Sequence, residues 1–210
     1  GFIQIKVKTS GNPLPIKYYR ERDLETQVTC DSCGLVFAIY GVFATCPDCC
    51  RLNAAVVLEK SIEVAKKKLG LVDSAEDEAL KEGLLEDAIS AGISAFDAFG
   101  KVLRDHYTGV FPNKPRNLFQ NLKVLCQVLI DTFGVQLHDL IGQEKAKVMN
   151  RMFQVRHIYE HNAGVIDDDF IRKIPLTNQK GRKYILTKAE LGQFITKLQE
   201  LAKKIYGEVE

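Results

Sequence analysis

An arginine, two histidines and an asparagine lie close together at the end of a predicted helix, in the stretch Arg156-His157-Ile158-Tyr159-Glu160-His161-Asn162. Histidine can exchange a proton near neutral pH. Arginine holds a phosphate group with a rigid fork of N–H donors. These residue types in one helical segment predict a site that handles phosphate.

The same segment allows three simpler interpretations. Arg156 and Glu160 are four residues apart and can form an ion pair on the helix surface. His161 can interact with the negative end of the helix dipole. His157 and His161 share a face and could supply half of a metal site, although no further ligand is placed to complete it. Arg156 and His161 lie roughly 140° apart around the helix, so they do not share one narrow face.

Four cysteines form two CxxC pairs, Cys30/Cys33 and Cys46/Cys49, with twelve residues between the pairs. This spacing is typical of a closed four-thiolate zinc site, which leaves no position open for a catalytic water. We therefore predict a structural Zn²⁺ held by these four residues. Cys50 could replace Cys49 as the fourth ligand. Two disulfides in a secreted domain are the alternative, which the lack of a signal peptide and the extra cysteine disfavour.

The segment around these cysteines has the composition of a small β domain. Residues 35–45 are rich in β-branched and aromatic residues, with Gly41 in the middle, and predict a hairpin. Gly34 follows the second cysteine, where a metal-binding turn often needs a positive φ. Residues 1–11 alternate apolar and charged side chains, which predicts a strand rather than a signal peptide, and the opening Gly leaves room for an upstream segment. We assign a zinc ribbon to residues 1–50, whose apolar hairpin predicts contact with a neighbouring domain or a protein partner.

From residue 51 onward, apolar residues recur with a helical period. The pattern predicts helices over residues 51–70, 76–109, 115–134, 141–164 and 188–207, with capping boxes at Asp73 and Thr187 and an irregular or hairpin segment before the last helix. Glycines 83, 92 and 100 indicate close helix packing or a break. The expected fold class is mainly α, with a connecting helix over 51–71 and an antiparallel helical bundle over 72–210 behind the small N-terminal ribbon.

Charge is unevenly distributed, although the net charge is only +2. Residues 73–87 hold seven acids and one base, whereas residues 170–205 hold nine bases and two acids. The basic segment could attract a polyanion, or it could be balanced by the acidic segment. No apolar run approaches the roughly 18–20 residues of a membrane span, so we expect a cytoplasmic protein without a membrane partner.

The Arg156-x4-His161 pattern, on the penultimate helix of a predicted bundle, resembles the R-x(4–6)-H signature of the HEPN superfamily. His157 matches the polar residue that often follows the arginine, and the resemblance covers residues 72–206. It implies a homodimeric helical bundle with two motifs facing each other across a cleft. Many HEPN proteins are metal-independent endoribonucleases, some in defence or toxin–antitoxin systems. Others are non-catalytic modules that bind RNA or nucleotides or assemble proteins.

The resemblance also implies roles for individual residues. His161 would be the general acid/base and Arg156 would stabilise the phosphorane formed when the ribose 2′-OH attacks phosphorus. His157 would orient the phosphate or share proton transfer. Asn162 would hydrogen-bond the substrate or fix the end of the helix. The expected partners are therefore RNA and a second copy of the chain.

Overall fold

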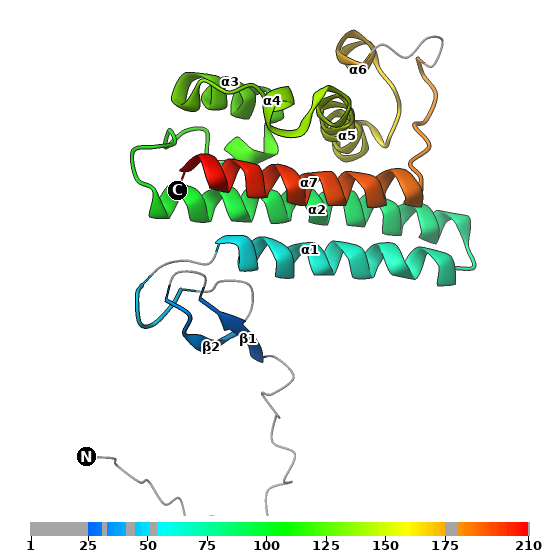
Figure 1. Cartoon of the computed structure of the whole chain (residues 1–210). Helices are drawn as coiled ribbons and strands as arrows, with labels where there is room; N and C mark the ends of the chain where they lie inside the picture. The colour runs from blue at the N-terminus through cyan, green and yellow to red at the C-terminus, as the bar shows by residue number, and fades with distance from the viewer. Residues whose placement is uncertain (1–24, 31–32, 41–44, 51–53, 175–179, 210) are drawn as a thin grey trace, which may run out of the picture.

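The computed structural model describes residues 25–30, 33–40, 45–50, 54–174 and 180–209, so the strand predicted over residues 1–11 lies outside it. The described residues form a mainly helical fold with a small N-terminal sheet (Figure 1). The helices are α1 (Ala54–Leu71), α2 (Glu78–His106), α3 (Leu122–Phe133), α4 (Leu137–Ile141), α5 (Gln143–Asn162), α6 (Asp168–Lys173) and α7 (Lys188–Val209). None of these helices is both long enough and apolar enough to span a bilayer.

The sheet is a two-stranded antiparallel hairpin of β1 (Glu25–Thr29) and β2 (Val36–Tyr40), in which Val28 faces Phe37. The turn between the strands carries the first CxxC pair, so residues 36–40 pair with the segment before that turn. The predicted hairpin within residues 35–45 therefore has only its first strand confirmed, since residues 41–44 lie outside the described part. Val36 is 60% exposed, which leaves an apolar side chain of the sheet open to solvent.

Three long helices, α1, α2 and α7, lie alongside one another (Figure 1). The helix α1 runs antiparallel to α2, as expected, but α7 runs in the same direction as α2. The chain from α3 to α6 returns over these helices before α7 begins, which accounts for the parallel pair. The helix α5 is seen end-on in this view, so it crosses α2 and α7 rather than lying along them.

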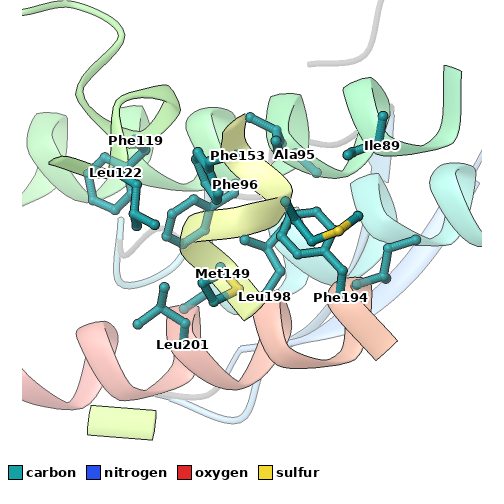
Figure 2. Packing of buried hydrophobic residues seen from close by; sticks show 14 of the residues in the cluster. Ile89, Ala95, Phe96, Phe119, Leu122, Met149, Phe153, Phe194, Leu198 and Leu201 are labelled. Carbon is teal, nitrogen blue, oxygen red and sulfur yellow. The ribbon is translucent and has the colours of Figure 1, made fainter. Parts of the chain in front are cut away.

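The core lies where α5 crosses α2 and α7 (Figure 2). The ring of Phe153 on α5 packs edge-to-face on Phe96 of α2 and Phe194 of α7, with centroid distances of 6.4 and 6.1 Å. Met149 on the same face of α5 is fully buried. This apolar face of α5 fixes the helix in rotation and so determines which of its side chains reach solvent.

The end of α1 and the cap of α2 differ from the predictions, whereas the cap of α7 does not. The helix α1 continues through Gly70 to Leu71, and α2 is capped by Asp77, whose Oδ1 accepts from Ala79 N at 3.3 Å, rather than by Asp73. The Thr187 cap is confirmed, because its hydroxyl oxygen accepts from Glu190 N at 3.2 Å.

The helix predicted from Pro115 begins instead at Leu122, where the Asn121 side chain accepts from Val124 N. A 3₁₀ turn over Leu118–Gln120 precedes it and places Leu118 and Phe119 in the core. Burial of these two side chains outweighs the preference of proline for a first helical turn.

Gly100 explains how this turn approaches α2 so closely. A β-carbon at this position would lie 2.0 Å from Cδ2 of Phe119, so only glycine leaves room for the ring. The prediction of close packing at Gly100 is confirmed. A β-carbon at Gly83, by contrast, would meet no atom within 4 Å, and α2 continues without a break through both positions.

Candidate functional site

The four predicted zinc ligands are brought together at the base of the sheet. Their sulfur atoms all lie within 4.8 Å of one another, with Cys30 Sγ 3.5 Å from Cys49 Sγ and Cys33 Sγ 3.5 Å from Cys46 Sγ. These separations exceed the roughly 2.05 Å of a disulfide, so none of the four cysteines is disulfide-bonded. They approach the roughly 3.8 Å between sulfurs on a zinc tetrahedron with Zn–S bonds of about 2.3 Å. The cluster can hold a metal ion, and its donors are those that Zn²⁺ prefers.

Tight turns position these thiols. Gly34 has φ +75° and donates its N–H to Cys30 O at 2.9 Å, as predicted for the residue after the first pair. Cys50 N donates to Cys46 O at 2.9 Å and closes the second turn. Cys50 itself is exposed and is not a member of the cluster, so Cys49 is its fourth cysteine.

The cluster requires a cation to ionise fully. A backbone hydrogen bond from Leu35 lowers the pKa of the Cys33 thiol, but desolvation and the thiols of Cys46, Cys30 and Cys49 outweigh it and raise that pKa to about 12. Four thiols in contact cannot all become thiolates unless a positive charge compensates them.

Arg156, His157 and His161 line one cleft of about 400 Å³ at the C-terminal half of α5. The opposite wall is formed by the segment before α3 and its first turn, including Gln120 and Lys123. The cleft is also lined by Asn117, Asn121, Leu122, Phe153, Gln154, Glu160 and Lys173. Three of the four residues predicted for phosphate chemistry therefore open into the same space.

The cleft covers a broad face of α5. Arg156 and His161 stand at the two edges of an arc of roughly 140°, and His157 lies between them. The rings of His157 and His161 are in contact, with centroids 4.7 Å apart. The angular offset that separates Arg156 from His161 thus does not prevent both side chains from lining one cleft.

Arg156 is held by a polar network that reaches into the core. Its Nη2 forms an ion pair with Glu160 Oε1 at 2.5 Å and donates to Gln120 Oε1 at 3.5 Å. Gln120 Nε2 donates in turn to Oδ2 of Asp97, a carboxylate that is only 2% exposed. Lys101 forms an ion pair with the same oxygen at 2.7 Å. Gln120 therefore joins the buried carboxylate to the arginine of the cleft.

Two buried atoms of this network have no hydrogen-bond partner among the described residues, Arg156 Nε and Asp97 Oδ1. An unpaired buried polar atom is costly, so the arrangement around Arg156 is not optimised for stability alone. Such exceptions are common where a side chain serves a ligand.

Asn162 does not line the cleft. Its Nδ2 donates to Val165 O at 2.7 Å, beyond a helix end where Ala163 and Gly164 have φ of 49° and 78°. Of the two roles expected for this residue, the structure contains the contact that fixes the end of α5. The short helix α6, which sequence periodicity did not predict, follows this turn and brings Lys173 to the cleft.

Sequence reasoning missed the residues that α5 meets across the cleft. Gln120 and Lys123 are more than thirty positions away from Arg156 in sequence, so no local pattern connects them. The available signal was the run of polar residues at Asn117, Gln120 and Asn121 between buried apolar ones. Because such residues break an apolar stripe, they indicate a surface that is partly open.

The basic C-terminal segment is largely balanced by acids. Lys183 forms an ion pair with Glu82 at 2.5 Å, and Lys188 forms one with Asp73. Arg172, Lys173 and Lys180 pair with Asp168 or Asp169. Five of the nine bases in this segment are therefore paired with acids. Only Lys183 and Lys188 pair with the acidic stretch 73–87, so the predicted balance by that stretch is confirmed for these two residues.

Comparison with known proteins found no match, either to a protein-family model, to a curated protein or to a solved structure. The function must therefore be argued from the residues of this chain.

Proposed function

We propose that this protein is a HEPN-type, metal-independent endoribonuclease whose active site is the cleft on α5. The observation that supports this proposal most directly is that Arg156, His157 and His161 line one cleft together with Lys123 and Lys173. The site combines groups that move protons with groups that bind phosphate. No second cluster of metal-ligating side chains was found among the described residues, apart from the four cysteines.

The proposed reaction is an internal transesterification. The ribose 2′-oxygen attacks the adjacent phosphorus while a neutral histidine takes the 2′-OH proton, and the bond to the 5′-oxygen breaks as a protonated histidine supplies a proton to it. The products are a 2′,3′-cyclic phosphate and a 5′-hydroxyl end. His161 and His157, whose rings touch, are the proposed pair for these two transfers.

Arg156 would stabilise the charge that develops on the phosphorane oxygens. Its ion pair with Glu160 has to open or shift for the guanidinium to reach phosphate, since the Arg156 side chain is only 17% exposed. Lys123 would bind the substrate phosphate from the opposite wall. Lys173 would bind it from α6 once its ion pair with Asp169 opens. In the HEPN arrangement, a second copy of the chain would place its own motif across the same cleft.

The zinc ribbon is proposed to be structural and to contact a protein partner. Four thiolates fill the coordination sphere of a tetrahedral zinc ion, so the centre would have no free position for substrate. The exposed Val36 of the sheet is an apolar side chain suited to such a contact.

A second candidate function is a non-catalytic HEPN-type module that binds RNA or nucleotides or serves as an interaction scaffold. The closed Arg156–Glu160 ion pair favours it, because a paired arginine contributes less charge to a phosphate site. In this case the cleft would bind a phosphate group without cleaving the chain.

The test is cleavage of a mixed-sequence single-stranded RNA in EDTA by the wild type, His161→Ala and Arg156→Ala. His138→Ala serves as the matched control, since His138 lies on α4, is exposed and does not line the cleft. A DNA strand of the same sequence is the substrate control, because it lacks the 2′-hydroxyl.

Cleavage by the wild type and His138→Ala, with loss of at least about a hundredfold in the two cleft variants and cyclic-phosphate ends, would support the nuclease. Equal cleavage by all four proteins would exclude this cleft as the active site. RNA binding without cleavage, weakened by Arg156→Ala, would establish the second candidate.

A further inference from the structure

A second cationic cleft lies beside the proposed active site. It has a volume of about 300 Å³ and is lined by Lys101, Arg104, Asp105, Asn113 and Arg116. Lys101 is paired with the buried Asp97, so Arg104 and Arg116 against the single carboxylate of Asp105 give the lining its positive balance at neutral pH. None of the described contacts of Arg104 or Arg116 is an ion pair with a carboxylate, in contrast to most bases of the segment 170–205.

Arg104 is fixed at this cleft by the backbone. Its Nη1 donates to Pro115 O at 3.0 Å and to Arg116 O at 3.2 Å. A guanidinium has five N–H donors, so these two bonds orient the group and leave three donors for a ligand. An oriented arginine loses little conformational entropy on binding an anion, which is the property of a binding group rather than of a solvated surface charge.

The two clefts adjoin each other along the chain and through a shared network. Arg116 lines the second cleft and Asn117 lines the first, and consecutive Cα atoms are only about 3.8 Å apart. Lys101 of the second cleft shares the Asp97 carboxylate with Gln120 of the first. A ligand that occupies both clefts must therefore be extended and carry repeated negative charges.

We propose that the cleft of Lys101, Arg104 and Arg116 binds a flanking phosphate of the RNA strand whose scissile phosphate lies in the α5 cleft. The proposal rests on the proposed function, because the RNA strand is the ligand that links the two sites. The RNA backbone would then follow the surface around residues 101–116 rather than the segment 170–205, whose bases are mostly paired. Non-specific strand binding of this kind depends on such a cationic groove.

The test compares binding of two uncleavable ligands, a 2′-O-methyl RNA of about 12 nucleotides, within the range covered by one single-strand-binding domain, and a 2′-O-methyl dinucleotide with one phosphodiester. The proteins are the wild type, Arg116→Gln and Lys204→Gln. Arg116 is exposed, so its replacement leaves the core intact. Lys204 is an exposed base of α7 outside both clefts and loses the same charge.

We expect Arg116→Gln to weaken binding of the longer RNA about tenfold at low salt, the size of one charge-assisted contact, and to leave dinucleotide binding unchanged. The slope of log affinity against log salt should fall by about 0.7 for the lost phosphate contact. Lys204→Gln should alter neither ligand. Equal effects of the two variants on the longer RNA, or an equal loss of dinucleotide binding in Arg116→Gln, would overturn the subsite.

Cleavage of unmodified RNA separates this result from the proposed function. A wild type that cleaves RNA while Arg116→Gln binds like Lys204→Gln would retain the nuclease and refute the subsite. A wild type that binds the longer RNA through Arg116 but cleaves nothing would refute the nuclease and retain the subsite.

Discussion

Gly100→Ala should destabilise the protein, although alanine is the better helix former. The added methyl group would lie 2.0 Å from Cδ2 of Phe119. That ring cannot move aside easily, because it packs against Phe96, Phe99 and Phe111 with centroid distances of 5.2, 6.2 and 5.8 Å. The helix α2 or the 3₁₀ turn must therefore shift.

Two opposing effects determine how much folding stability Gly100→Ala loses. Overpacking a buried site costs typically about 1–3 kcal/mol, and a rigidly enclosed ring places Gly100→Ala near the upper end. Replacing glycine within a helix returns about 1 kcal/mol. The expected net loss is about 2 kcal/mol, which corresponds to a fall in Tm of about 4–8 °C for a chain of this length.

Gly83→Ala is the matched control, since a β-carbon there meets nothing within 4 Å in the same helix. It should gain up to about 1 kcal/mol. Urea denaturation followed by circular dichroism at pH 7 measures both variants. If Gly100→Ala is as stable as Gly83→Ala, the contact between α2 and the turn that carries Gln120 is not as close as described, and the wall of the cleft is wrongly placed.

Three further predictions concern the cysteine cluster, the Tyr184–Glu190 hydrogen bond and the α5 cleft. Cys33→Ser should lower the zinc content measured by mass spectrometry about tenfold or more but keep the helical circular dichroism, because none of the sheet side chains described, those of residues 27–29 and 36–38, belongs to the helical core. Burial and the hydrogen bond to Glu190 raise the pKa of Tyr184. The protonated phenol therefore favours the folded state. This contribution to stability is complete below pH 10 and is lost as the pH rises further. Tyr184→Phe should therefore cost about 1 kcal/mol at pH 7 and flatten the alkaline loss of stability in urea titrations at several pH values. Glu160→Gln should tighten RNA binding about threefold by releasing Arg156, whereas weaker binding would contradict the role of the cleft as an anion site.

The features that depend on local spacing were predictable from the sequence. The CxxC pairs identified the four clustered cysteines, and the helical period located the long helices, including the end of α3 at Gly134 with φ 70°. Pro115 misplaced the start of α3, because the burial of Phe119 is a tertiary effect that local propensity does not contain. The polar wall opposite Arg156 depends on the same turn, so it could not be predicted either.

Charge shows most clearly what the fold adds to the sequence. Along the chain, the densest basic region is 170–205, and it was the natural candidate for contact with RNA. In the folded protein, Lys183 and Lys188 are paired with acids of the stretch 73–87, so these two charges contribute little to attracting a polyanion. Arg104 and Arg116 are sparse in sequence, but neither is in an ion pair among the described contacts, although Lys101 of the same cleft is paired with Asp97. A polyanion responds to the local surplus of positive charge rather than to the number of bases in a segment. The surface beside the α5 cleft is therefore the better candidate for the path of the proposed RNA ligand.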